Sequence, residues 1–254
     1  MSRRRFYAPP GAFSPGGQTV TLSSGETHHL RDVLGLRSGD EAYVFDGRGK
    51  EYRSIVRVFA NGAAELEVTE EVVPAQPESS LQLTLALALL KGDKFDLVVQ
   101  KATELGVTRI VAVTTKRGDV RPRDSQHERK RVERWRSIAR DAAKQSGRAL
   151  IPEILGILDC PSVITGTAGV TPGTRLMFSE GGGRPVADAI GGVDSASRTI
   201  TALVGSEGGW TAEEIDQARE AGWEIVTLGG RTLRAETAAI VVLALLQHRL
   251  GDLA

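Results

Sequence analysis

Residues 199–209 read TITALVGSEGG, and residues 224–234 read EIVTLGGRTLR. Each segment begins as an apolar, strand-like run and ends in a glycine-containing loop. Glycine has no Cβ atom, so its backbone can approach a flat or charged ligand closely. In a parallel sheet, ligands bind beyond the carboxyl ends of the strands. The two loops, together with the glycine-rich segment 179–183 after a third apolar run, therefore predict one binding pocket.

From Leu81 onward, apolar strand-like segments alternate with segments of helical periodicity. The predicted strands are Leu81–Leu90, Val107–Thr114, Arg175–Phe178, Thr199–Val204 and Glu224–Leu228. The predicted helices are Asp93–Leu105, Ser125–Ser146, one that starts at the capping box Thr211–Glu214, and the apolar, buried Glu236–Leu246. Ser125–Glu128 is interpreted as a second capping box. This alternation predicts an α/β domain with a mainly parallel sheet over residues 81–254.

Residues 1–72 show a different pattern, which is typical of a small β-rich domain. Alternating runs at Glu41–Phe45, Glu51–Phe59 and Ala64–Val72 are separated by Asp-Gly and Asn-Gly pairs, which are strong hairpin signals. A short helix is expected over His28–Leu34. Residues 73–80 are rich in proline and serine, so they are predicted to be the linker between the two domains.

The formal net charge is zero, but positive charge is unevenly distributed along the chain. The segment Lys116–Arg148 is strongly basic, and Arg3-Arg4-Arg5 adds a second basic point near the N-terminus. A local excess of positive charge attracts polyanions, so the zero total does not exclude an RNA partner. A solvated helix face is the alternative interpretation of the long basic segment taken alone.

Other features restrict the class of protein. Cys160 is the single cysteine and has no His or Cys neighbour at metal-ligand spacing, so neither a disulfide nor a metal site is expected. No apolar run is long enough to span a bilayer and no signal peptide is visible, so the expected location is the cytoplasm. The glycine fingerprint of dinucleotide-binding folds is absent, as is the P-loop, which disfavours a nucleotide-dependent oxidoreductase.

The C-terminal loops carry a resemblance to a known family. The sequence GSEGGW at residues 205–210, then Glu213-Glu214, then LGGRTLRAETA at residues 228–238, closely resembles the bacterial RsmE family. The resemblance extends along the chain through RFY at 5–7, HLRDVL at 29–34, KGDK at 91–94, QKATELGV at 100–107, QSGR at 145–148 and PEI at 152–154. The two loops together are highly specific, whereas either loop alone would be only suggestive.

Members of that family use S-adenosylmethionine to methylate N3 of a uridine in 16S ribosomal RNA of the small subunit. The resemblance implies a PUA-like β-barrel domain at residues 1–72, which binds RNA, and a SPOUT methyltransferase domain at residues 81–254. It also implies a C-terminal trefoil knot, which pattern alone would exclude because knots are rare. It further implies a homodimer with each active site near the subunit interface, and a reaction that needs no metal.

Two residues depart from the family's pattern. Ser206 stands where the family usually has proline, so we expect a less preorganised loop rather than lost binding. Thr232 replaces a usual aliphatic residue, which affects the packing expected under the cofactor.

The resemblance also implies a set of cofactor-binding residues. Backbone groups would cradle the adenosine and the methionine moiety, apolar side chains would contact the adenine, and one carboxylate lies in the first loop. In that order the residues are Gly205, Gly208, Leu228, Gly229 and Leu233, then Leu203 and Val204, then Glu207.

Catalysis requires activation of the uracil. Its N3 atom carries a proton at neutral pH, so a positive group near O2 or O4 must stabilise the developing anion. We expect Arg234 in this role; an ion pair to Glu236 or to the partner subunit is the structural alternative. Glu236 or Glu207 can act as base only if the pocket raises the carboxyl pKa. For Glu207, a position at the N-terminus of the next helix is the preferred interpretation.

RNA contacts are expected from basic side chains of both domains. Phosphate contacts position the RNA without specifying its sequence, so they predict a salt-dependent affinity. The candidates are Arg3, Arg4, Arg5, Arg31, Arg117, Arg121, Arg123 and Arg148.

Two alternatives remain for the function: another knotted methyltransferase, acting on a ribose 2′-hydroxyl or a transfer RNA, and a non-catalytic ribosome-assembly factor that binds RNA.

Overall fold

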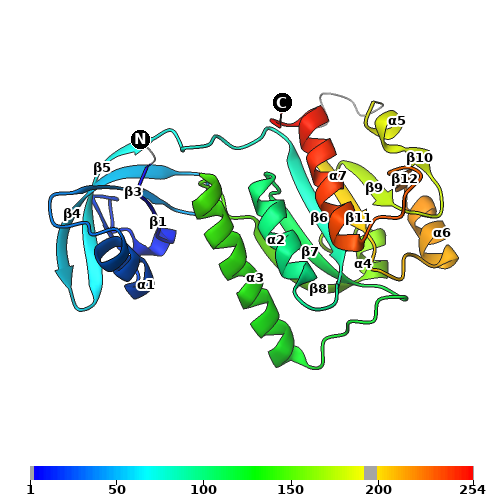
Figure 1. Ribbon diagram of the computed structural model, residues 1–254, viewed down its shortest axis with the longest axis horizontal. Coiled ribbons are helices and arrows are strands. Elements are labelled where there is room, and N and C mark those ends of the chain that lie inside the picture. The colour runs from blue at the N-terminus through cyan, green and yellow to red at the C-terminus, as the bar shows by residue number, and fades with distance from the viewer. Residues whose placement is uncertain (1–2, 192–198, 254) are drawn as a thin grey trace. The chain divides into compact units, whose positions relative to one another are not determined.

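The computed structural model describes residues 3–191 and 199–253 of the chain (Figure 1). The chain forms two compact units. The first consists of Met1–Glu78 with Arg140–Ile151, and the second consists of Ser79–Ala139 with Pro152–Ala254.

The first unit is built on a five-stranded sheet with the order β1-β3-β4-β5-β2. Its strands are β1 (Arg5–Tyr7), β2 (Thr19–Thr21), β3 (Glu41–Phe45), β4 (Glu51–Ala60) and β5 (Ala63–Val72). The antiparallel pairs β3–β4 and β4–β5 confirm the predicted hairpins. Asn61 and Gly62 both have positive φ, as a tight hairpin turn requires. The strands β1 and β2 are too short to show a periodicity in the sequence.

A short helical segment covers this sheet. Helix α1 (Ser24–His28) continues into a π-helical turn, His29–Val33, so the helix expected at His28–Leu34 begins four residues earlier. The Ser23 side chain accepts a hydrogen bond from the backbone N–H of Glu26 and thereby caps α1. The core beneath it is made of fully buried apolar side chains from the helix and the strands: Phe6, Val20, Leu22, Leu30, Leu36, Val44 and Leu66.

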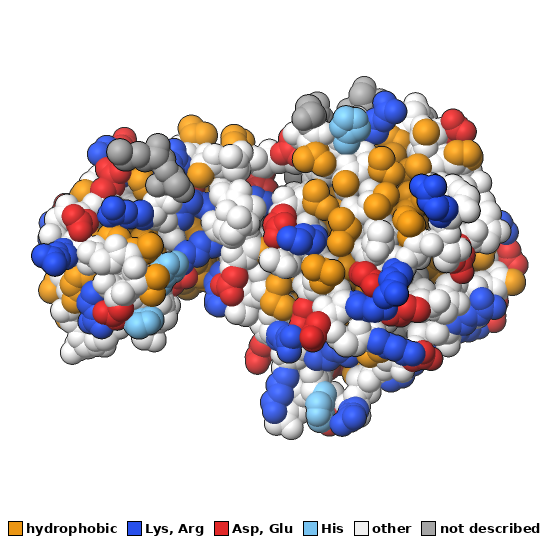
Figure 2. All heavy atoms as spheres, viewed as in Figure 1, with side chains coloured by type: hydrophobic (Ala, Val, Ile, Leu, Met, Phe, Trp, Pro, Cys, Tyr) orange, Lys and Arg blue, Asp and Glu red, His pale blue; other side chains and the backbone are white. Residues whose placement is uncertain are grey.

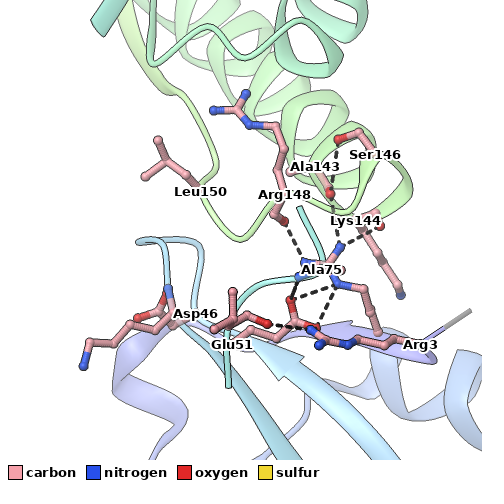
Figure 3. Close-up of polar contacts among 12 residues, drawn as sticks. Arg3, Asp46, Glu51, Ala75, Ala143, Lys144, Ser146, Arg148 and Leu150 are labelled. Carbon is pink, nitrogen blue, oxygen red and sulfur yellow. Dashed lines mark hydrogen bonds and ion pairs between the residues drawn. The ribbon is translucent and has the colours of Figure 1, made fainter. Parts of the chain in front are cut away.

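A buried ion pair joins the sheet of the first unit to residues 140–151 (Figure 3). The Arg5 guanidinium lies 3.1 Å from the carboxylate of Glu51, whose surface is fully buried. The same guanidinium donates to the backbone carbonyls of Ala143, Lys144 and Arg148. Arg5 therefore satisfies carbonyl groups at the C-terminal end of a helix, where a cation is favoured.

The second unit contains a seven-stranded sheet with the order β10-β12-β9-β11-β6-β7-β8. Every pairing in this sheet is parallel, which confirms the predicted α/β class. The strands are β6 (Gln82–Ala88), β7 (Arg109–Thr114), β8 (Glu153–Asp159), β9 (Thr174–Phe178), β10 (Arg184–Pro185), β11 (Thr199–Val204) and β12 (Glu224–Thr227). Neither β8 nor β10 was predicted from the sequence. Glycine interrupts the apolar residues of β8, and β10 has only two residues.

The helices of the chain's α/β part are α2 (Lys94–Glu104), α3 (Ser125–Ser146), α4 (Cys160–Ile164), α5 (Val186–Gly191), α6 (Ala212–Glu220) and α7 (Ala235–Leu250). The capping box predicted at Thr211 and Glu214 is present at the start of α6. The one predicted at Ser125 is wrong, because Asp124 accepts hydrogen bonds from the backbone N–H groups of Gln126 and His127. Within the described residues, no helix is long and apolar enough to cross a membrane.

The strand order explains how the predicted loops meet. Strand β9 lies between β11 and β12, so the carboxyl ends of these three strands are neighbours in the sheet. The chain leaving β11 must cross β9 to reach β12, and then returns to α7, which packs against α2 (Figure 1). The loops 179–183, 205–209 and 228–234 consequently converge at one edge of the sheet.

Candidate active site

A cavity of about 410 Å³ lies at this edge of the sheet. Its walls come from the ends of β9, β11 and β12, from the three loops that follow them, and from the first turn of α7. The lining residues are Phe178, Ser179, Glu180, Val204, Gly205, Ser206, Glu207, Gly209, Trp210, Thr227, Leu228, Gly229, Gly230, Arg231, Thr232, Leu233, Arg234, Ala235 and Ala238. The predicted convergence of the loops on one pocket is therefore confirmed.

Trp210 fixes the shape of the first loop, a role that sequence reasoning missed. Its indole Nε1 donates to the backbone carbonyl of Phe178 at 2.8 Å, which joins the loop after β11 to the end of β9. A Cβ atom at Gly205 would lie 3.1 Å from the indole ring, so a side chain there would crowd the tryptophan. Glycine at 205 thus permits close packing of the ring against the loop.

Most of the predicted cofactor-binding residues lie on the cavity, namely Val204, Gly205, Glu207, Leu228, Gly229 and Leu233. Two lie outside the lining. The side chain of Leu203 is fully buried in the core of the second unit, because successive side chains of a strand point to opposite faces. A Cβ atom at Gly208 would lie 2.6 Å from the carbonyl oxygen of Arg117, so this glycine allows two backbones to pass closely.

The two residues that depart from the family's pattern are both in the cavity wall. Ser206 is only 8% exposed, and its hydroxyl oxygen has no hydrogen-bond partner within the described residues. Thr232 is exposed. A proline at 206 would present no hydroxyl group, so the buried Oγ is a particular feature of this chain.

Arg234 lines the cavity at the N-cap position of α7. Its side chain is exposed, and among the described residues no carboxylate pairs with it, so the alternative of an Arg234–Glu236 ion pair is not formed. Glu236 lies outside the cavity lining and faces Lys94, with 3.4 Å between Lys94 Nζ and its Oε2 atom. This placement argues against a direct role for Glu236 in proton removal.

Glu207 has a different environment from the one expected. Thr211 and Glu214 cap α6, so the interpretation of Glu207 as the carboxylate of that helix terminus is wrong. Instead, Lys94 Nζ donates to Glu207 Oε1 at 2.8 Å. Burial raises the pKa of the Glu207 carboxyl, but hydrogen bonds and the charge of Lys94 outweigh it, so the pKa lies below its usual value. Such a carboxylate is a poor proton acceptor and a good hydrogen-bond acceptor.

Lys94 was not among the residues predicted for the site. Its hydrogen bond to Glu207 raises the pKa of its ammonium group, so the lysine is charged at neutral pH. The only signal for it in the sequence was its place in the segment KGDK, because no spacing rule connects residue 94 to residues 207 and 236.

The predicted RNA-binding arginines divide into two groups. Arg4, Arg31, Arg117 and Arg123 are exposed, and exposed Arg121 donates to the carbonyl oxygen of Thr115. Arg3 is part-exposed and bonded to Glu51 and to the carbonyl of Val73.

Arg5 and Arg148 do not belong to that surface. Arg5 is 7% exposed and Arg148 is 4% exposed. Arg5 pairs with Glu51, and the Arg148 guanidinium donates to Glu78 at 2.7 Å. Both guanidinium groups are therefore unavailable to a phosphate, and their assignment as RNA contacts is wrong.

Among the described residues, neither Cys160 nor a cluster of possible metal ligands forms a second reactive centre. Cys160 is buried, and burial raises the pKa of its thiol to about 12. Throughout the described ranges, no group of three or more His, Cys, Asp or Glu side chains could hold a metal ion.

Comparison with known proteins decides the family. The model of the RNA methyltransferase domain matches residues 77–247. The ribosomal RNA small subunit methyltransferase E of Synechocystis sp. is 36% identical over 227 residues, which cover 89% of this chain and 72% of that protein. The chain belongs to the RsmE family.

Other RsmE family members agree in sequence and in structure. The one from Mycobacterium bovis is 30% identical over 231 residues, which cover 89% of this chain and 85% of that protein. A crystal structure of the Neisseria gonorrhoeae member bound to S-adenosyl methionine has a TM-score of 0.86 and 35% identity, and covers 100% of both chains. A putative methyltransferase from Legionella pneumophila in complex with the same cofactor has a TM-score of 0.86 and 29% identity, and covers 99% of this chain and 100% of that one.

Proposed function

We propose that this RsmE family member uses S-adenosylmethionine to methylate N3 of a uridine in 16S ribosomal RNA of the small subunit. The observation that carries the proposal is the single cavity formed by the three loops at the ends of β9, β11 and β12. Family membership supports the reaction class, and the resemblance of the loop sequences supports uridine N3 as the target atom.

The cavity suits a cofactor of this size and chemistry. Its volume of about 410 Å³ falls within the range of about 300–1,000 Å³ for small-molecule sites. Val204, Leu228 and Leu233 offer apolar surface for an adenine ring, and Glu207 offers a carboxylate for a donor group. Near Gly229, no described atom lies within 4 Å of the position a Cβ atom would take, so the backbone there is open to a ligand.

The chemistry requires the residues to orient the uracil and stabilise its anion. When bound in the cavity, S-adenosylmethionine would supply the methyl group to N3, and its sulfur would retain the electron pair of the carbon–sulfur bond. Arg234, whose guanidinium has no carboxylate partner among the described residues, would lie beside O2 or O4 of the uracil. Its positive charge lowers the pKa of N3–H, so the proton can leave to water.

Changing Arg234→Gln is expected to lower kcat about 100-fold with little change in cofactor affinity, because a preorganised charge acts mainly on the anionic transition state. Steady-state methyl transfer and calorimetric titration with S-adenosylmethionine measure the two effects. Arg231→Gln is the matched control, since Arg231 is an exposed arginine of the same loop that also lines the cavity. An unchanged kcat for Arg234→Gln would remove this residue from the mechanism.

We also propose a C-terminal trefoil knot and the assignment of the two domains. A trefoil knot is supported by the path of the chain, which leaves β11, adds β12 beyond β9 and then forms α7, a helix in contact with β11 and α2. A PUA-like RNA-binding domain at residues 1–72, a linker at 73–80 and a SPOUT domain at 81–254 are supported by the two sheets. Residues 140–151 nevertheless group with the first unit.

A homodimer is also part of the proposal. Helix α7 is apolar on nearly every side, and Figure 2 shows hydrophobic side chains gathered over it. Ile240, Val241 and Leu245 are part-exposed there, and Leu97 of the adjoining α2 is 41% exposed. An apolar surface of this kind is typical of a subunit interface.

RNA binding is proposed to involve the exposed arginines of both units. The change Arg31→Glu reverses the charge of an exposed side chain that is paired only with its exposed neighbour Asp32 in the described structure. We expect weaker RNA binding and a salt dependence whose slope falls by about 1, with unchanged affinity for S-adenosylmethionine. Filter binding at several salt concentrations measures the slope. Arg57→Glu, an equal charge reversal on β4, is the control, and equal losses for both variants would contradict a specific role for Arg31.

The experiment that tests the proposed function is transfer of labelled methyl from S-adenosylmethionine to small ribosomal subunits from a strain that lacks this protein. Mass spectrometry of the digested RNA identifies the product. We expect 3-methyluridine. Label in a ribose 2′-hydroxyl, or in transfer RNA only, would assign the enzyme to another substrate. No transfer together with no cofactor binding would favour a non-catalytic assembly factor.

A further inference from the structure

One lysine joins two carboxylates beside the cavity. Lys94, the first residue of α2, lies 2.8 Å from Glu207 in the loop after β11 and 3.4 Å from Glu236 in the first turn of α7. Three segments that are far apart in the sequence therefore meet at a single ammonium group. The contact links the loop that forms one cavity wall to the helix that forms another.

The burial of Glu236 shows which member of the cluster depends on the lysine. The Glu236 side chain is 13% exposed, and its Oε2 atom has no hydrogen-bond partner within the described part of the chain. A carboxylate with so little contact with water is destabilised unless a cation compensates it. Lys94 supplies this cation, so the ion pair fixes the positions of both the Glu236 and the Lys94 side chains.

Glu207 is the only member of this cluster that lines the cavity within the described residues. Glu236 and Lys94 lie outside the lining, and Lys94 contacts both carboxylates. The contacts therefore run from the part-buried Glu236 through the lysine to the Glu207 carboxylate at the cavity wall. Lys94 also lowers the pKa of Glu207 against the effect of burial, so the wall carries a negative charge at neutral pH.

We propose that Lys94 and Glu236 are positioning residues that hold the Glu207 carboxylate at the cavity wall, where it accepts hydrogen bonds from a donor group of the cofactor. The inference rests on the proposed function, because it takes S-adenosylmethionine as the ligand. That molecule carries an amino group and ribose hydroxyls, and hydrogen bonds from such donors to an ionised carboxylate are stronger than those to a neutral acceptor.

The test is binding of S-adenosylmethionine to the whole chain by calorimetry, without RNA. Lys94→Met is expected to weaken binding about 10-fold at neutral pH, the scale of one hydrogen bond to a charged group. The loss should grow as pH falls towards about 5, because without the lysine burial raises the pKa of Glu207 and only backbone hydrogen bonds lower it. Wild-type affinity should stay nearly constant over the same interval, since its carboxylate remains ionised.

Three further variants separate positioning from a general loss of structure. Lys94→Arg keeps a cation between the carboxylates and should restore most of the affinity and the flat pH profile. Glu236→Gln removes the anchoring charge and should give a smaller loss of affinity than Lys94→Met. Lys101→Met is the matched control, because Lys101 is a lysine of the same helix that pairs with Glu104 and lies outside the cavity lining; its affinity should equal that of the wild type.

Two results would overturn the inference while leaving the proposed function intact. One is wild-type affinity in Lys94→Met across the whole pH interval. The other is a loss of affinity that is independent of pH and is not restored by Lys94→Arg, which would mean that the lysine only supports the fold. Absence of S-adenosylmethionine binding by the wild-type chain would instead overturn the proposed function and the inference together.

Discussion

Arg5→Met is expected to destabilise the first unit by about 3–5 kcal/mol, because the buried Glu51 carboxylate loses its buried cation and keeps only the more exposed Arg3. Glu51 is fully buried, and its carboxylate accepts hydrogen bonds from Nε and Nη2 of Arg5. The backbone N–H of Ala75 donates a further hydrogen bond to it (Figure 3). The carbonyls of Lys144 and Arg148 lose their donor in the same variant. The change thus removes several buried interactions at once.

The aromatic residues make the measurement selective. All three tyrosines (Tyr7, Tyr43 and Tyr52) belong to the first unit, and all three tryptophans (Trp135, Trp210 and Trp223) belong to the second. In Arg5→Met, the midpoint of urea unfolding followed by the NMR signals of the tyrosines should fall strongly. The midpoint followed by tryptophan fluorescence should fall less. Arg53→Met, which removes exposed ion pairs with Glu41 and Glu70, should change stability little.

A second substitution sharpens this test. The double variant Arg5→Met with Glu51→Met replaces both buried charges by apolar groups and should recover much of the lost stability, since the remaining partner of Glu51, Arg3, is part-exposed. If Arg5→Met were as stable as the wild type, the buried pair would not hold residues 140–151 against the sheet.

Gly229→Val is expected to lower the affinity for S-adenosylmethionine by about 100-fold or more. Gly229 has a φ of +108°, a backbone conformation that a β-branched residue rarely adopts. In the described structure nothing lies within 4 Å of the position of its Cβ atom, so valine would occupy ligand space rather than clash with protein. Both effects act on the loop 228–234 and leave the core unchanged. Calorimetric titration measures the loss.

The control for backbone strain is Gly222→Val. Gly222 also has a positive φ, of +82°, and also has open space around the Cβ position among described atoms, but it lies outside the cavity lining. Gly222→Val should lower the stability of the protein but leave its affinity for S-adenosylmethionine unchanged. Unchanged affinity in Gly229→Val would place the cofactor elsewhere on the protein.

Much of the secondary structure was predictable because its signals are local. The strands at Glu41–Phe45 and Thr199–Val204 and the helix Ser125–Ser146 appear within the residues predicted for them. Continuous apolar runs mark buried parallel strands, and Thr211 with Glu214 marks a helix start. The strands β1, β2 and β10 escaped prediction because two or three residues are too few to show a period of two.

The amino-acid sequence by itself determined where the glycine loops lie and that they follow buried strands, because apolar periodicity and glycine placement are properties of neighbouring residues. Only the tertiary structure decided which charged residues face the ligand and which are buried. Arg5 and Arg148 look like any basic residues in the sequence, yet each meets a carboxylate more than 40 positions away. Lys94 likewise meets Glu207 across 113 positions. Ion pairs of this kind follow from the order of strands in a sheet, which no local pattern specifies.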